Sequence, residues 1–264
     1  MPRVGWAVHP ASATPLNGRL GPHRRVDWLS MSLADFKAVA KALSCTINDL
    51  VLATVTGAVR TFLISHHLHP EEIDFRVSAP VSVRRDAERG RLGNRVSSWI
   101  LQLPIAEADP AHRLAAIRRV TQDLKATNQA LGVETMMAIA EWTPTVLLPL
   151  GARAAGGPID MILTNVPGPQ FPLYLLGARL LELYPQVPLL ESTGLGVAIF
   201  SYDGKLFWGF NADYELVPDL RDFVKAIAAA FRDLGALAPG TRRPANDDAR
   251  GGAAEAQTAA ATGR

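Results

Sequence analysis

Three histidines close together are the residues of this sequence best suited to chemistry. His66, His67 and His69 lie in the run His-His-Leu-His-Pro-Glu-Glu, and imidazole is a common metal ligand and general base. The run follows a long predicted helix, however, and a helix C-terminus stabilises histidines through its dipole without any ligand. We therefore expect no metal site here.

Cysteine and the familiar catalytic motifs add no further chemistry. The single cysteine, Cys45, excludes a disulfide within the chain and is expected to act as a small buried hydrophobic residue in a reducing compartment. The sequence has no Gly-x-Ser-x-Gly, no P-loop, no Gly-x-Gly-x-x-Gly after a strand and no paired cysteines. Its residues alone predict no particular reaction.

The amino-acid composition limits the classes of partner that we expect for this protein. The chain has 264 residues, of which 48% are hydrophobic, and its 27 basic and 25 acidic residues leave a net charge of +2. This balance argues against nucleic acid as a partner, although it allows weak attraction to an anionic membrane or to acyl-CoA. No run of 18 apolar residues and no signal-peptide core is present. We expect a cytoplasmic protein, at most peripheral to a membrane.

The elements around these residues are organised by one turn, Thr164 to Pro169. Two prolines and a glycine there must end the apolar strand predicted over 159–165, because proline lacks an amide donor. A second apolar run, 171–184, follows the turn. Helices and strands alternate before it, and a hairpin and a helix come after it, so we predict an α/β fold with one mixed sheet and packed helices.

Periodicity and capping residues predict the other elements. Ser32 and Thr46 are good N-caps, each followed three residues later by an aspartate, Asp35 or Asp49. Asp203-Gly204 favours a two-residue type I′ hairpin. We predict helices from Ser32 to about 43, from Thr46 to about 65, over 109–125 and from 218 to 235, and strands over 73–83, 95–103, 194–201 and 205–211.

Three further segments carry expectations. Residues 1–26 are rich in proline and turn pairs and are expected to be linker-like, while 238–264 lack large apolar residues and are expected to be disordered. The domain should therefore span 27–237. Residues 134–150 are apolar but interrupted by two prolines, and they predict either a kinked core helix or an exposed apolar edge.

Several motifs, in a fixed order from about residue 14 to 235, resemble those of the bacterial wax ester synthase/diacylglycerol acyltransferase family. They include Asn48-Asp49-Leu50-Val51, Ala79-Pro80-Val81-Ser82-Val83-Arg84, Asn165-Val166-Pro167-Gly168-Pro169 and Ser201-Tyr202-Asp203-Gly204. The resemblance implies a fold like chloramphenicol acetyltransferase and condensation domains, with two similar halves and an active-site tunnel between them. The resemblance covers only the C-terminal half of the family's proteins.

The resemblance also implies that the two halves of the family's proteins have different functions. The family's His-His-x-x-x-Asp-Gly motif lies in the N-terminal half, where its second histidine would act as general base on a hydroxyl that attacks an acyl-CoA thioester. The run from His66 to Glu72 has glutamates in place of the motif's Asp and Gly, so we reject it as a catalytic site. No catalytic residue, metal or cofactor is expected in this chain, and acyl-CoA would be a co-substrate.

Four residues match motifs that the resemblance places near the tunnel: Asn48, Asp49, Asn165 and Gly168. Each has a structural alternative. Asp49 and Asn48 fit the start of a capped helix, and Asn165 and Gly168 fit the shaping of a turn. The sequence leaves both interpretations open for each pair.

We therefore predict the C-terminal domain of an O-acyltransferase acting on a diacylglycerol or a long-chain alcohol. The linker-like start at Met1 suggests a truncated product or one chain of a split enzyme, inactive alone, whose catalytic histidine comes from another chain. Expected partners are a family N-terminal half or a second copy, through an apolar face, and contact with a membrane or lipid droplet. The alternative is a non-catalytic lipid-binding or protein-interaction module.

Overall fold

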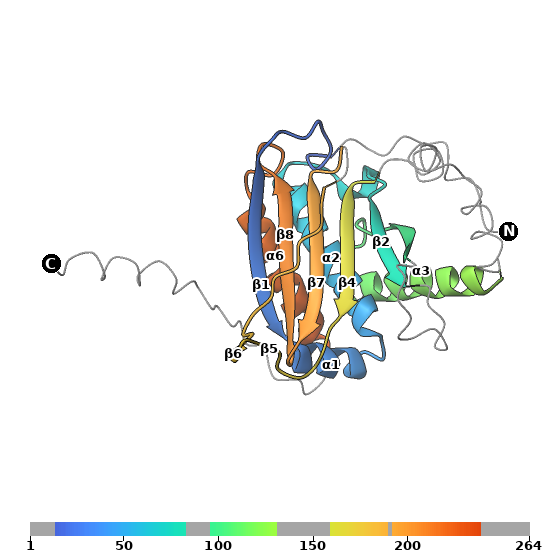
Figure 1. Ribbon diagram of the computed structural model, residues 1–264. Coiled ribbons are helices and arrows are strands. Elements are labelled where there is room, and N and C mark those ends of the chain that lie inside the picture. The colour runs from blue at the N-terminus through green and yellow to red at the C-terminus, as the bar shows by residue number, and fades with distance from the viewer. Residues whose placement is uncertain (1–13, 83–95, 131–158, 190–191, 239–264) are drawn as a thin grey trace.

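Three parallel strands form the middle of a mixed sheet (Figure 1). The computed structural model describes residues 14–82, 96–130, 159–189 and 192–238. Within these residues the sheet order is β1-β8-β7-β4-β2-β3, in which β2, β4 and β7 are parallel to one another and the other neighbours are antiparallel. The strands are β1 Arg24–Ser32, β2 Arg76–Ser82, β3 Val96–Gln102, β4 Met161–Pro167, β7 Leu195–Tyr202 and β8 Lys205–Asp213.

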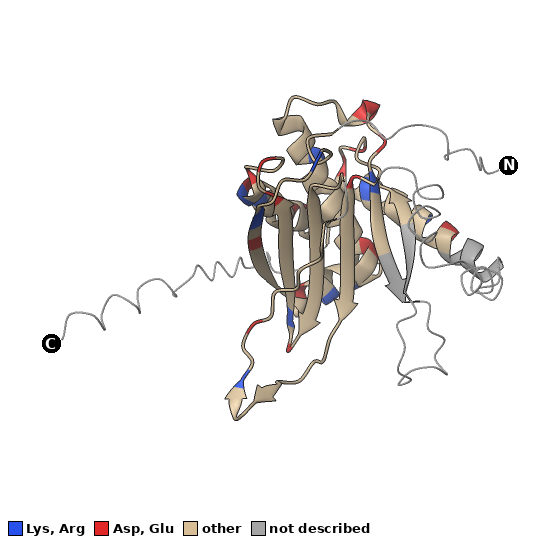
Figure 2. Cartoon of the chain, turned by 45° about the horizontal axis from the view of Figure 1, so that its top comes forward, with Lys and Arg blue, Asp and Glu red and all other residues tan. Residues whose placement is uncertain are grey.

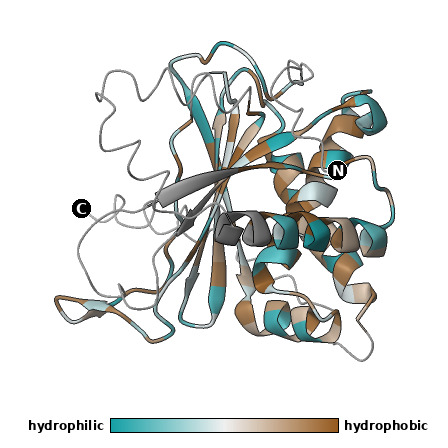
Figure 3. Ribbon diagram, turned by 90° about the vertical axis from the view of Figure 1, so that its right-hand side faces the viewer, coloured by the Kyte–Doolittle hydropathy of each residue, from teal (hydrophilic) through white to brown (hydrophobic). Residues whose placement is uncertain are grey.

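The helices cover one face of this sheet (Figure 3). They are α1 Leu33–Ala42, α2 Ile47–Ser65, α3 Pro110–Ala130 and α6 Leu220–Ala236, with a short 3-10 helix η1 at Pro70–Glu72. The core between the layers includes Phe36 stacked on Phe231 with ring centroids 4.0 Å apart, and the fully buried Trp208. The predicted α/β architecture with a mixed sheet and packed helices is confirmed.

Helix α2 is the central helix of the domain. Thr46 caps it by accepting from the Asp49 amide, and Asp49 accepts in return from the Thr46 amide, so the predicted capping box is confirmed. By length and composition alone α2 could cross a membrane, but 72% of its apolar window is buried inside the domain. It is therefore a core helix, which fits its apolar residues on nearly all sides.

The hairpin between β7 and β8 follows the sequence closely. Asp203 and Gly204 have φ angles of 44° and 83°, which is the left-handed pair that a type I′ turn requires. The strands pair from Leu195 with Ala212 to Tyr202 with Lys205. The predicted hairpin is confirmed.

On the face away from the helices, residues 184–189 cross β8 and β7 as a strap. A side chain at Gly209 would collide with the Pro185 carbonyl oxygen, and one at Gly196 would lie 2.6 Å from Val187. The side-chain amide of Asn211 (Nδ2) donates to the Val187 carbonyl oxygen over 3.0 Å. Two glycines therefore let the strap lie directly on the sheet backbone.

The N-terminal segment differs from the prediction. Leu16 is fully buried in the core and Arg24 to Val26 belong to β1, so residues 14–26 are part of the folded domain and not a linker. β1 pairs with β8, from Arg24 with Asp213 to Ser32 with Lys205, and such a distant partner leaves no local signal in the sequence. The predictions for 1–13, 134–150 and 239–264 concern residues outside the described part of the chain.

Candidate functional site

The described candidate residues come together where the three parallel strands end. Ten residues join the end of α2 to the start of β2, and the two elements run in opposite directions. The N-terminus of α2 therefore lies at the edge of the sheet where β2 ends and where β4 and β7 also end (Figure 1). Met161 and Leu163 of β4 pack in the helix-side core. By the two-residue period of a strand, Asn165 faces the same side. Asn165 and the Asn48–Asp49 pair therefore share one edge and one face.

Asp49 is 5% exposed and holds two helices together. One carboxylate oxygen accepts from the Thr46 amide (3.0 Å) and hydroxyl (2.7 Å), and the other accepts from the Thr121 hydroxyl of α3 (2.8 Å). Both oxygens are thus engaged within the fold, whereas Asn48 beside it is exposed. The structural role of Asp49 is clear, and Asn48 is the one of the pair left facing solvent.

Asn165 lies near the end of β4, and Gly168 directly follows the strand. Asn165 is half-buried. The Gly168 amide donates to the Ser201 hydroxyl of β7 (3.1 Å), and a side chain at Gly168 would collide with the Phe200 ring and the Ser201 carbonyl. Gly168 therefore shapes the turn by allowing close approach to β7. The motifs did not reveal that Thr121 contacts Asp49, and although Ser201 lies in one of them, its contact with Gly168 was not predicted.

The described histidines lie at the other end of the domain. A 19-residue helix is roughly 28 Å long, and His66, His67 and His69 follow its C-terminus. His66 is held there by the Phe62 carbonyl (2.9 Å) and by Asp219 (3.5 Å). His112 at the start of α3 and His23 before β1 also lie at that end. No group of three possible ligands for a metal ion occurs among the described residues.

An apolar arm, residues 171–183, projects beyond the edge of the sheet where β4 and β7 end, which is the edge of the candidate site (Figure 2). It contains the two-residue strands β5 Tyr174–Leu175 and β6 Ala178–Arg179. Its large apolar side chains range from 36% exposed at Leu183 to fully exposed at Leu176. Tyr202 fixes its base, because the hydroxyl accepts from the Leu173 amide (2.7 Å) and donates to the Leu180 carbonyl (3.0 Å).

Comparisons with known proteins identify the family. The model of the WS/DGAT C-terminal domain matches residues 92–235, more than half of the chain. The chain belongs to the wax ester synthase/diacylglycerol acyltransferase family. The family's catalytic-domain model also matches residues 4–51, which include β1, α1 and the start of α2. The resemblance that the motifs indicated is confirmed.

Relatives and solved structures agree with this assignment. The chain is 33% identical over 220 residues to the O-acyltransferase WSD of Acinetobacter baylyi, and 33% identical over 242 residues to a Mycobacterium tuberculosis protein named a probable diacylglycerol O-acyltransferase. The wax ester synthase/diacylglycerol acyltransferase from Marinobacter aquaeolei superposes with a TM-score of 0.70 at 23% identity, covering 86% of this chain and 52% of that one. A condensation domain from the enacyloxin polyketide synthase gives 0.59 at 18% identity, covering 89% and 46%. The condensation-domain fold is thereby confirmed.

The same comparisons show how much of the relatives the chain represents. It spans about half their length: 47% of the Acinetobacter protein and 51% of the mycobacterial one, while the matches cover 81% and 89% of this chain. The expectation of a half-domain is confirmed. The sequence also lacks the His-His-x-x-x-Asp-Gly motif.

Proposed function

We propose that this chain forms the C-terminal half of an O-acyltransferase that moves an acyl group from acyl-CoA to a diacylglycerol or a long-chain alcohol. The observation that carries the proposal is the match of the family's C-terminal domain model to residues 92–235, in a chain about half as long as its acyltransferase relatives. The other half, in this or another chain, would supply the catalytic histidine.

The reaction sets what each half must provide. A general base removes the hydroxyl proton of the acceptor as its oxygen attacks the thioester carbonyl, and the C–S bond breaks to release CoA, which takes up a proton. The five described histidines lie at the opposite end from Asn48 and Asn165. This edge therefore offers amide and hydroxyl groups that can orient a substrate, and the base would come from the facing half.

We propose that the apolar arm contacts that other half. Its leucines at 175, 176 and 181 are 75%, 101% and 72% exposed, and burying one leucine contributes about 1.5–3 kcal/mol. The arm is anchored by Tyr202 and by an Arg179–Asp203 ion pair of 2.7 Å. An ordered apolar projection at the candidate edge is suited to docking on a second domain.

The test is reconstitution of acyl transfer. The N-terminal half of the Acinetobacter relative is produced with this chain, and transfer from a labelled acyl-CoA to hexadecanol and to dioleoylglycerol is measured, with that relative's own C-terminal half as positive control. We expect no transfer by this chain alone and transfer by the pair. Replacing Leu175 and Leu176 by serine should weaken the pairing, while the control Leu237→Ser, outside the arm, should not.

Two results would contradict the proposal. Transfer by the purified chain alone would place a complete active site within it. Failure of the pair, with the positive control active and lipid bound by this chain, would instead favour a non-catalytic lipid-binding module.

A further inference from the structure

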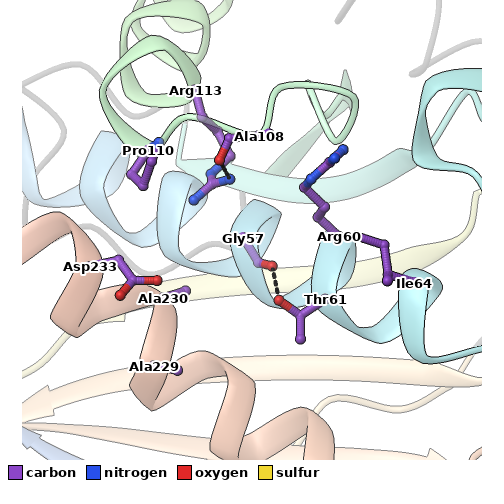
Figure 4. Close-up of a pocket in the computed structure, with 10 residues that line it drawn as sticks. All are labelled: Gly57, Arg60, Thr61, Ile64, Ala108, Pro110, Arg113, Ala229, Ala230 and Asp233. Carbon is purple, nitrogen blue, oxygen red and sulfur yellow. Dashed lines mark hydrogen bonds between the residues drawn. The ribbon is translucent and has the colours of Figure 1, made fainter.

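A pocket of about 170 Å³ lies among α2, α3 and α6, away from the candidate site (Figure 4). Its floor is made of small residues, among them Gly57 and Ala230, and its charged lining comes from Arg60, Arg113 and Asp233. It lies toward the C-terminal end of α2, whereas Asn48 and Asp49 lie at the helix start. Nothing in the proposed acyl transfer uses this pocket.

Arg113 is 4% exposed, yet its guanidinium is only partly hydrogen-bonded. One terminal nitrogen, Nη1, donates to the carbonyls of Glu107 (3.1 Å) and Ala108 (3.3 Å). Among the described residues Nε has no hydrogen-bond partner and Nη2 donates to none. A side chain at Gly57 would lie 3.0 Å from Nη2, so Gly57 provides the space this nitrogen occupies at the pocket.

A second guanidinium stands beside it. Arg60 donates to the carbonyls of Ile105 (2.9 Å) and Ala106 (3.0 Å) and pairs with Glu71 at 3.0 Å. Burial, and then the charge of Arg60, lower the pKa of Arg113 from its usual value. Holding two cations together in this way costs free energy, which a bound anion would offset.

The opposite wall carries the opposite charge. Asp233 is exposed on α6 and lines the pocket, and among the described residues it forms no hydrogen bond or ion pair. It therefore stands more than 4 Å from the Arg113 nitrogens. Figure 4 shows the carboxylate on one side of the pocket, Arg113 above Gly57, and Arg60 on the far side. The lining is dipolar, with two positive groups and one negative group.

We propose that this pocket binds a small zwitterion of the phosphoethanolamine type, with the phosphate at Arg113 and Arg60 and the ammonium at Asp233. A phosphate alone would be repelled by Asp233, and an ammonium alone by the two arginines. A phosphate monoester carries about −1.5 to −2 at neutral pH, so its phosphate matches the guanidinium side of the pocket and its ammonium matches the Asp233 side. The group could come from the free compound or from a lipid headgroup.

Calorimetric titration of the full chain tests the proposal through a change of sign. We expect Asp233→Asn to weaken phosphoethanolamine binding by about threefold to fivefold, the size of an exposed ion pair. The same change should strengthen binding of inorganic phosphate, because it removes a repulsion. Asp222→Asn, also an exposed aspartate on α6 but outside the pocket, is the matched control and should change neither.

Other outcomes would overturn it. These are no binding of phosphoethanolamine to the wild-type chain, or a loss on Asp233→Asn that is equal for both probes. A water-bridged Arg113–Asp233 pair with no ligand would give the first result. Co-sedimentation with vesicles of phosphatidylethanolamine against phosphatidylcholine then distinguishes the sources: preference for the former indicates a headgroup, and binding of the soluble compound alone indicates a free metabolite.

Discussion

Replacing Asp49 by alanine should destabilise the domain strongly, and replacing Asn48 should not. Asp49→Ala removes the capping box, worth typically about 1 kcal/mol, and the bond from Thr121 to a buried carboxylate, worth about 1.5–3 kcal/mol. The free energy of unfolding should therefore fall by about 2–4 kcal/mol. Asn48 is exposed, so Asn48→Ala should change it by less than about 0.5 kcal/mol.

Urea unfolding followed by circular dichroism measures both changes, and Thr121→Val completes a double-mutant cycle. The coupling energy between Asp49 and Thr121 should fall in the range of about 0.5–3 kcal/mol expected for contacting residues. A loss below 0.5 kcal/mol for Asp49→Ala, or equal losses at positions 48 and 49, would refute the reasoning. If Asn48→Ala leaves stability intact but lowers the turnover of the reconstituted enzyme, Asn48 belongs to the site and Asp49 to the scaffold.

Two further changes test the fold. Asp160 is fully buried, and one of its carboxylate oxygens accepts from the Arg76 backbone amide (2.7 Å). The other oxygen accepts no hydrogen bond within the described part of the chain, and burial raises the pKa of Asp160 to about 6. The stabilising form is thus the neutral one, present below about pH 4 and lost as the pH rises to 6, so Asp160→Asn should add up to about 3 kcal/mol at pH 7 relative to wild type. An unchanged pH dependence of the urea midpoint would contradict this. Gly209→Ala drives a side chain into the Pro185 carbonyl and should cost about 1–3 kcal/mol, whereas Gly21→Ala, with only an ordinary contact at 3.7 Å, should cost less in the same unfolding assay.

The sequence predicted the elements whose causes are local. Thr46 and Asp49 lie three residues apart, and Asp203-Gly204 specifies its own turn, so the α2 start and the β7–β8 hairpin follow from short-range chemistry. β1 was missed because its sequence, with Arg24, Arg25 and Asp27 in its first four residues, lacks a clean alternation and gains its strand structure from β8. Propensity is overridden there by pairing with a distant strand.

The sequence predicted which residues belong to the candidate site, but it did not predict the contacts that each of them makes. The motif residues gave Asn48, Asp49, Asn165 and Gly168, and the fold brings the first three to one face of one edge. What the sequence could not supply is the partner of each group, because Thr121 and Ser201 lie 72 and 33 residues away from the atoms they contact. A hydrogen bond of that span depends on how helices and strands pack.

The arrangement of polar and apolar groups supports the proposal that this half folds but acts together with a second half. Large side chains such as Trp208, Phe36 and Phe223 are fully buried in the core between the sheet and the helices. The arm is different, because Tyr202 holds its base while the Leu176 side chain, between β5 and β6, is fully exposed. The helices thus cover one face of the sheet, while an apolar projection remains at the same end of the domain as Asn48 and Asn165, away from every described histidine. A second domain seated on the arm would bury it and bring a general base to that edge in one step, which couples assembly of the two halves to activity.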